Sequence, residues 1–135
     1  MTSKVIYKGA LRTESVHLRS GSTIITDAPI DNHGKGATFS PTDLVATALA
    51  NCIITVMGIV ANRKSIDITG TQAEVTKTMA SNPRRISAIR VRILFPTDKQ
   101  YTASERSILE HTARTCPVAL SLSQDLVQDL SFVYA

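Results

Sequence analysis

The sequence has few aromatic residues and few cysteines, and both shortages limit what the protein can be. It contains no tryptophan, and aromatic residues make up 4% of the chain. Proteins that bind single-stranded nucleic acid usually stack the bases on aromatic side chains, so this composition argues against that function. The two cysteines have no Cys-x-x-Cys spacing, and the three histidines lie at unhelpful distances from them, so the sequence does not predict a zinc site. We expect no metal and no cofactor.

The chain also lacks a dense run of one charge. Its formal net charge is +4, and its isoelectric point is near 9.3. The most basic part of the chain spreads its arginines over a predicted turn and strand: Arg84, Arg85, Arg90 and Arg92. This spread is more typical of a solvated surface than of a nucleic-acid site. We therefore expect no nucleic-acid partner.

A secretory signal is missing as well. The first residues, MTSKVIYKG, contain no long apolar segment, so we expect the protein in the cytoplasm. In a reducing compartment two cysteines seldom form a structural disulfide, and catalytic or redox use is the usual exception. The 135 residues, 43% hydrophobic and 19% charged, predict one domain over residues 1–135 with a hydrophobic core.

One long stretch, residues 44–61, contains neither a charge nor a proline. Before it, Ser40 is a favourable N-cap, Pro41 suits the first helical position, and Asp43 can close a capping box. These signals predict a helix over residues 41–61. Because small or apolar residues point in every direction around it, we expect other structure to surround this helix.

A membrane-spanning segment is the alternative interpretation of this stretch, because its length is near the lower limit for crossing a bilayer. Thr47, Asn51 and Thr55 interrupt the apolar run, and no aromatic belt flanks it. We therefore expect a core helix of a soluble domain, and no membrane partner.

Alternating and capped segments account for the rest of the chain. Residues 5–7, 11–19 and 22–26 are predicted strands, and a Ser20-Gly21 turn joins the last two in a hairpin. Further strands are predicted at about residues 73–79, 86–95 and 126–134. A capping box at Thr102 and Glu105 begins a second helix, and Cys116-Pro117 begins a short third one. This order predicts the α+β class, with antiparallel sheets packed around the long helix.

Two cysteines and one arginine have the most chemical potential. Cys52 lies near the middle of the long helix, where a buried cysteine is often only a small hydrophobic side chain. Cys116 is expected at a helix N-terminus, where the helix dipole stabilises a thiolate. Arg12 shares a strand face with Val16 and points inward if Val16 does, whereas Arg19 is on the other face.

The segment FSPTDLVATALANC, which ends at Cys52, and the segment TCPVALSL around Cys116 together resemble the OsmC/Ohr family of bacterial hydroperoxide-reducing proteins. The resemblance spans nearly the whole chain. It implies an intertwined homodimer with thiol-dependent peroxidase activity toward organic hydroperoxides. Cys52 matches the peroxidatic cysteine, which becomes a sulfenic acid, and Cys116 matches the resolving cysteine. The resemblance also implies a dithiol reductant, either a small thiol or a lipoyl-bearing protein.

The same resemblance implies two further site residues. Arg12 matches the family's arginine, with Arg19 in reserve, and would stabilise the Cys52 thiolate and hold the peroxide oxygen. Asp43 is the candidate for the family's carboxylate, because Thr42 occupies the position at which some members carry glutamate. Asp43 lies nine residues before Cys52 and on the opposite helix face, so it must act through Arg12 or from the other subunit. A capping role alone is equally compatible with its position.

The alternative function is a non-catalytic protein that binds a small molecule on the same fold. The sequence does not separate it from the peroxidase, because the shape of a pocket is not written in a linear motif.

Overall fold

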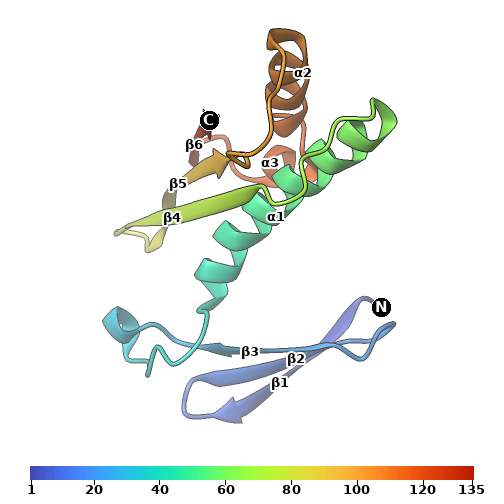
Figure 1. Ribbon diagram of the computed structural model, residues 1–135. Coiled ribbons are helices and arrows are strands. Elements are labelled where there is room, and N and C mark those ends of the chain that lie inside the picture. The colour runs from blue at the N-terminus through green and yellow to red at the C-terminus, as the bar shows by residue number, and fades with distance from the viewer. The chain divides into compact units, whose positions relative to one another are not determined.

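The computed structural model describes all residues from Met1 to Ala135. The chain forms two compact units, Met1–Val45 and Ala46–Ala135. Its helices and two three-stranded sheets confirm the α+β class (Figure 1). A single domain over residues 1–135 stays a prediction.

The first unit contains one antiparallel sheet in the order β1-β2-β3. Its strands are β1 Ser3–Gly9, β2 Arg12–His17 and β3 Thr23–Asp27. The predicted β2–β3 hairpin is confirmed, and β1 is longer at both ends than expected. After β3 the chain forms a short 3-10 helix, η1, at Ile30–Asn32. The β2–β3 register pairs Arg12 with Asp27, so their side chains lie on the same face of the sheet.

Few side chains of the first unit are buried, and those few are polar. They are Thr26, Asp27 and Ser40. Its large apolar side chains are exposed instead: Val5, Ile6, Tyr7, Leu11, Leu18, Ile24, Ile25, Ile30 and Phe39. The cluster of buried apolar residues begins only at Ala46. The first unit therefore contributes no side chain to that core, and it leaves an apolar surface uncovered.

Helix α1 spans Pro41–Arg63, two residues beyond the predicted end. It begins with the expected capping box. The Asp43 N–H donates to Ser40 Oγ at 3.0 Å, and the Ser40 N–H donates to Asp43 Oδ2 at 2.9 Å. These two bonds satisfy N–H groups for which the helix has no acceptor of its own. Arg63 in the last turn complements the negative end of the helix dipole.

One face of α1 is buried. It carries residues at the three- and four-residue spacing of a single helical stripe: Ala46, Leu49, Ala50, Ile53, Met57 and Ala61. Outside this stripe Ile59 is 47% exposed. The expectation that other structure surrounds the helix on every side is therefore wrong for one chain, because the core covers only one stripe.

α1 is also the one helix that is long and apolar enough to cross a membrane. In its most apolar window, 33% of the residues are buried. The core helix of a soluble protein passes the same test of length and composition, so this property alone does not indicate a membrane. The absence of a membrane partner stays a prediction.

The second unit contains the other sheet, in the order β4-β5-β6. β4 and β5 form an antiparallel hairpin, and two helices separate β5 from β6. The elements are β4 Gln72–Ala80, β5 Arg85–Leu94, α2 Ala103–Ala113, α3 Pro117–Ser121 and β6 Val127–Val133. The expected alternation in β5 is confirmed, since Ile89 and Val91 are buried whereas Arg90 is exposed. α2 begins at the predicted capping box of Thr102 and Glu105.

β6 differs from the expectation of purely antiparallel sheets, because it pairs with β5 in parallel. After the end of β5 the chain passes through α2 and α3. It then returns to the end of the sheet at which β5 begins, and β6 starts there beside β5. A helical crossover of this kind joins parallel neighbours, whereas a tight turn joins antiparallel ones. The sequence order contained the crossover helices, but the direction of β6 was not deduced from them.

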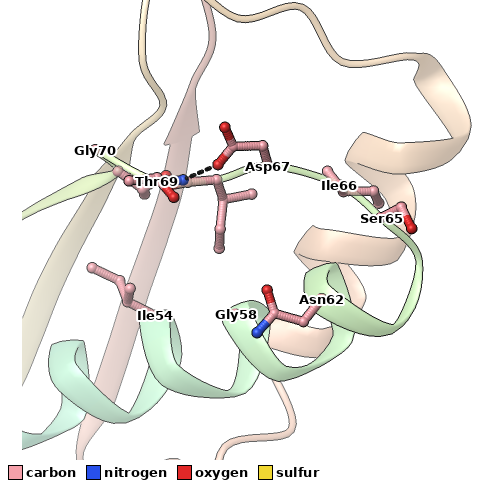
Figure 2. A pocket seen from close by; sticks show the side chains of 10 residues that line it. Ile54, Gly58, Asn62, Ser65, Ile66, Asp67, Thr69 and Gly70 are labelled. Carbon is pink, nitrogen blue, oxygen red and sulfur yellow. Dashed lines mark hydrogen bonds between the residues drawn. The ribbon is translucent and has the colours of Figure 1, made fainter.

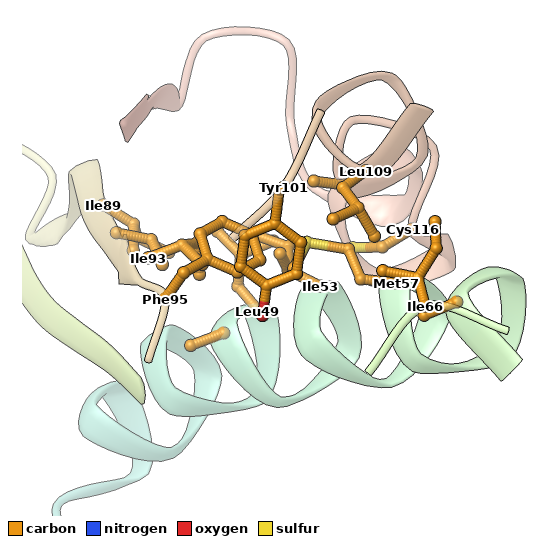
Figure 3. Close-up of a cluster of buried hydrophobic side chains, with 14 of the residues drawn as sticks. Leu49, Ile53, Met57, Ile66, Ile89, Ile93, Phe95, Tyr101, Leu109 and Cys116 are labelled. Carbon is orange, nitrogen blue, oxygen red and sulfur yellow. The ribbon is translucent and has the colours of Figure 1, made fainter. Parts of the chain in front are cut away.

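The core of the second unit lies between the buried stripe of α1, the inner face of β5 and α2 (Figure 3). Leu49, Met57, Ile89 and Leu109 are among its fully buried side chains. Aromatic rings close one side of it, with the Phe95 and Tyr134 rings stacked at 4.5 Å between centroids and Tyr101 tilted against Phe95 at 5.2 Å. Cys116, the residue directly before α3, belongs to the same buried cluster.

Candidate thiol site

Cys52 lies near the middle of α1, next to the buried stripe but not within it. It packs against the core as a partly buried residue. Leu49 and Ile53 fix the rotation of the helix, and that rotation leaves Cys52 partly open. A cysteine that served only as a core filler would be fully enclosed, as free cysteines usually are.

Cys116 occupies the N-cap position of α3, as predicted, with Pro117 at the first helical position. The Ala119 N–H donates a hydrogen bond to Cys116 Sγ at 3.2 Å. The side chain has no exposed surface. The proline and the buried cap together hold the sulfur in one position at the start of the helix.

The fold brings these two cysteines together, although 64 residues separate them in the sequence. They lie 3.6 Å apart, and a side-chain hydrogen bond joins the two thiols. Both are free cysteines and not a disulfide. Because an S–S bond is about 2.05 Å long, a shift of roughly 1.5 Å would join the sulfurs.

Burial raises the pKa of the Cys116 thiol above its ordinary value of 9.0, and the neighbouring Cys52 raises it further. The Ala119 N–H lowers the pKa of Cys116, because it stabilises the thiolate, but this effect is smaller than the effect of burial. The expectation that the helix N-terminus leaves Cys116 with a stabilised thiolate is therefore wrong. α3 has only five residues, and its dipole does not offset the loss of hydration.

Arg12 lies in the first unit, at the start of β2, and its charge is met there by Asp27 at the end of β3. Arg12 Nε donates to Asp27 Oδ1 at 2.7 Å, and Nη2 donates to Oδ2 at 2.9 Å. The strand pattern predicts that Arg12 points inward if Val16 does. The Arg12 side chain is 41% exposed, so it is only partly buried. Asp27, in contrast, is 2% exposed. This pairing lowers the pKa of Asp27 and raises that of Arg12.

Sequence reasoning missed Asp27. The predicted strand ends at residue 26, whereas β3 continues through Asp27. The signal that could have found it is the hairpin register, since Val16 pairs with Thr23 and Arg12 then falls opposite Asp27. An oppositely charged pair at facing positions of two antiparallel strands is a favourable arrangement.

The remaining candidate residues are Asp43 and Arg19. Asp43 takes part in the capping box at the start of α1. Arg19, the reserve arginine, is exposed and lies in the turn after β2. No group of three or more His, Cys, Asp or Glu side chains is close enough to hold a metal ion.

A separate cavity of about 560 Å³ lies in the second unit, between the C-terminal half of α1 and residues 65–71 (Figure 2). Gly58 leaves open space at its wall. Asp67 accepts a hydrogen bond from the Thr69 N–H at 2.9 Å and pairs with Lys99 at 2.7 Å. Neither cysteine lines this cavity, so it is not part of the thiol site.

These features define an α+β protein with a close pair of reduced thiols, one partly open and one buried. Comparison with known proteins narrows this class. The pattern of the OsmC-like protein family matches residues 33–130, and the chain therefore belongs to that family. No sequence among curated proteins matches the chain.

Solved structures agree with this assignment. A Psychrobacter arcticus 273-4 protein, provisionally named an osmotic stress induced and detoxification response protein, is 50% identical, with a TM-score of 0.94 over 98% of this chain and 96% of that one. The organic hydroperoxide resistance protein OsmC of Legionella pneumophila is 16% identical, with a TM-score of 0.76 over 98% and 96%. An organic hydroperoxide resistance protein of Elizabethkingia anophelis is 14% identical, with a TM-score of 0.76 over 100% and 97%. The last two likenesses show the fold alone.

Proposed function

We propose that this protein is a thiol-dependent peroxidase that reduces organic hydroperoxides and protects against oxidative stress. The observation that carries the proposal is the pair of free cysteines 3.6 Å apart. A peroxidase of this type needs one thiol open to the substrate and a second within disulfide reach, because a lone sulfenic acid is exposed to further oxidation. Membership of the family to which the hydroperoxide resistance proteins belong supports the same chemistry.

In the first step the Cys52 thiolate attacks one oxygen of the O–O bond of the hydroperoxide. An S–O bond forms, the O–O bond breaks, and the leaving alkoxide takes a proton to give the alcohol. Cys52 is oxidised to the sulfenic acid as the peroxide is reduced. The partial exposure of Cys52 suits it for this role, because the substrate must reach its sulfur.

In the second step Cys116 attacks the Cys52 sulfur. An S–S bond forms, and the hydroxyl of the sulfenic acid leaves as water after it takes up the Cys116 proton. The raised pKa of Cys116 keeps this thiol protonated at neutral pH, so it does not compete with Cys52 for the peroxide. Its place against Cys52 gives it the advantage of proximity when the sulfenic acid appears.

An external dithiol then reduces the disulfide and returns both thiols, so the net reaction converts hydroperoxide and dithiol into alcohol, water and oxidised dithiol. A small thiol or a lipoyl-bearing protein would supply this reductant. The cytoplasm suits the cycle, because its thiol pool keeps the resting cysteines reduced.

Arg12 is proposed to stabilise the Cys52 thiolate and to hold the peroxide oxygen on which charge develops. Its partly exposed guanidinium supports the role, because the group retains N–H donors beyond those bound to Asp27. Asp43 is proposed as the carboxylate of the site, acting through Arg12 or from the other subunit. Comparing turnover and stability in Asp43→Asn separates this role from a purely capping one.

A homodimer is proposed because a single chain leaves two apolar surfaces uncovered. One is the outer face of α1 around Ile59, and the other is the apolar surface of the β1–β3 sheet. A second copy of the chain would cover both. Sedimentation of the pure protein would give twice the mass of one chain, 14.6 kDa, if this is right, and a single chain if it is wrong.

The test of the function is peroxide consumption by the pure protein with tert-butyl hydroperoxide and dithiothreitol. We expect thiol-dependent turnover for the wild type and none for Cys52→Ser. Thr55→Ser, on the same helix, is a matched control that should leave turnover unchanged, because its side chain is exposed and bonds only to the Asn51 carbonyl. Wild-type protein that binds hydroperoxide but does not consume it would instead favour the non-catalytic binding function.

A further inference from the structure

The Arg12–Asp27 pair differs from the other arginine–carboxylate pairs of the chain. In the Arg92–Glu74 pair, which also joins facing positions of two antiparallel strands, the side chains are 47% and 57% exposed. In the Arg12–Asp27 pair the arginine is 41% exposed, but the carboxylate is 3% exposed. Exposed pairs of the first kind contribute little to stability. In the Arg12–Asp27 pair the buried carboxylate is fixed in place, and the guanidinium bound to it remains partly exposed to solvent.

Asp27 is held in place from several sides. Its backbone N–H donates to the Phe39 carbonyl at 3.1 Å, and the Ala37 N–H donates to its carboxylate. The next residue, Ala28, donates its N–H to the Leu11 carbonyl at 3.1 Å. The carboxylate therefore has a fixed position at the junction of β2, β3 and the loop that follows. A group that is oriented in this way can orient its partner.

The bidentate contact also fixes which edge of the guanidinium is used. Asp27 takes the side edge, formed by Nε and Nη2. A guanidinium carries five N–H donors in a rigid plane, so the donors of Nη1 and the outer donor of Nη2 form a second edge that points away from Asp27. This second edge has the geometry to bind one more oxygen acceptor in the same plane.

We propose that Asp27 is a positioning residue of the peroxidase: it holds Arg12 by the side edge so that the outer edge faces the oxygen of a bound hydroperoxide. This proposal rests on the proposed function and adds to it a residue that touches neither the peroxide nor the thiols. Its effect is confined to the first half of the cycle, because the reaction of the disulfide with a dithiol has no peroxide oxygen for Arg12 to hold.

The experiment measures two constants for each variant by steady-state kinetics, kcat/KM for tert-butyl hydroperoxide and kcat/KM for dithiothreitol. Asp27→Asn should lower the peroxide constant by about 10- to 100-fold, since a small misplacement of a catalytic group has effects of this size. The dithiothreitol constant should stay within about threefold of wild type. Arg12→Ala should lower the peroxide constant by about 10²–10³-fold, as loss of an oxyanion donor does.

The double variant decides whether Asp27 acts through Arg12. If it does, Arg12→Ala with Asp27→Asn is no slower toward peroxide than Arg12→Ala alone. A merely structural role of Asp27 would multiply the two losses and would lower both constants. Glu74→Gln is the matched control, because it breaks a facing arginine–carboxylate pair in the other sheet and should leave both constants unchanged.

Three results overturn the proposal: a peroxide constant of Asp27→Asn within threefold of wild type, equal losses in both constants, or multiplied losses in the double variant. If Asp27→Asn does not fold, as judged by a missing cooperative unfolding transition, Asp27→Glu replaces it under the same criteria. That variant keeps the charge but moves the guanidinium outward by one methylene. Wild-type protein that shows no peroxide turnover would contradict the proposed function itself. Normal wild-type turnover together with an unchanged peroxide constant in Asp27→Asn would contradict only the role of Asp27.

Discussion

The two units of the chain bury opposite kinds of side chain. In Met1–Val45 the buried residues are Thr26, Asp27 and Ser40, whereas in Ala46–Ala135 they are the apolar residues of the core and the Cys116 thiol. The second unit thus resembles an ordinary hydrophobic domain. The first is a sheet whose apolar side chains stay open and whose interior position is given to a carboxylate. An exposed apolar surface of this kind is typical of an interaction site, which is why the proposed dimer includes it.

The two units also carry different chemical groups. The second unit provides a buried place for thiols, in which a raised pKa keeps Cys116 neutral. The first unit provides a charged pair, in which a buried carboxylate holds an open guanidinium. In the proposed mechanism, low polarity suits Cys116 as the resolving thiol, and the fixed ion pair suits Arg12 as the group that binds developing charge.

The largest effect is expected at the buried thiol. Cys116→Ser leaves Cys52 without a resolving partner, so excess peroxide should convert Cys52 to the sulfinic acid within a few turnovers, whereas wild-type protein stops at the disulfide. Intact mass spectrometry would show a gain of about 32 Da for the variant, since two oxygen atoms are added. A variant that shows no gain in mass on treatment, relative to its own untreated sample, would contradict the resolving role.

The next largest effect is expected from a core substitution in the second unit. Leu109→Ala should lower the free energy of unfolding by about 2–5 kcal/mol at every protein concentration, because it leaves a cavity in a fully buried site. Ile24→Ala, in the exposed sheet of the first unit, should destabilise the protein only through association, so its effect should depend on concentration. Urea unfolding at two concentrations, a hundredfold apart, would separate the two cases. A concentration-independent loss at Ile24 would mean that the sheet is covered within one chain.

Substitutions in the two capping boxes should have smaller effects, of similar size in the two units. Thr102→Ala in the second unit and Ser40→Ala at the end of the first should each lower the free energy of unfolding by about 1 kcal/mol, since each removes one accepted N–H bond at a helix start. Ser40 is 1% exposed and Thr102 is exposed, so the loss at Ser40 should be the larger of the two. Thermal unfolding of both variants measures the difference, and equal losses would show that burial of the cap has no effect.

The smallest effect is expected from acid titration. Lys99 and the Thr69 N–H lower the pKa of Asp67 in the second unit from 3.8 to about 2, and Arg12 lowers that of Asp27 in the first. A carboxylate whose pKa is lowered by folding adds stability above its unfolded pKa, and this is lost as the pH falls through its folded pKa. Between about pH 4 and pH 2, Asp67→Asn should therefore lose less stability than wild type. Urea midpoints across this window measure it, and equal losses in Asp67→Asn and wild type would contradict the prediction.

The capped helices were the most predictable part of the fold. The signals at Ser40–Asp43 and at Thr102–Glu105 act within four residues, and both boxes form as expected. The position of Cys116 at a helix start was predictable for the same reason, since Pro117 follows it directly. Parallel pairing of β6 was not predicted, because it depends on where the chain returns after two helices.

The site was predictable only in part. Cys52 and Cys116 were found from motifs that resemble a family, and that resemblance implied that the two thiols meet. No local rule predicts the contact, because 64 residues separate the two positions. The ionisation of Cys116 was predicted in the wrong direction. Helix position can be read from neighbouring residues, whereas burial depends on Met57, Leu109 and the rest of the core. Asp27 was missed because its role depends on the register of a hairpin.

The amino-acid sequence by itself determined where helices begin, which strand faces are apolar, and which residues carry redox chemistry. These properties arise from hydrogen bonds and side-chain periodicities that span a few positions. Only the tertiary structure decided that the two sulfurs lie side by side, that burial raises the pKa of the Cys116 thiol, and that a buried carboxylate holds Arg12. Distance and hydration inside a protein are set by the packing of all its elements at once, and no short segment contains that information.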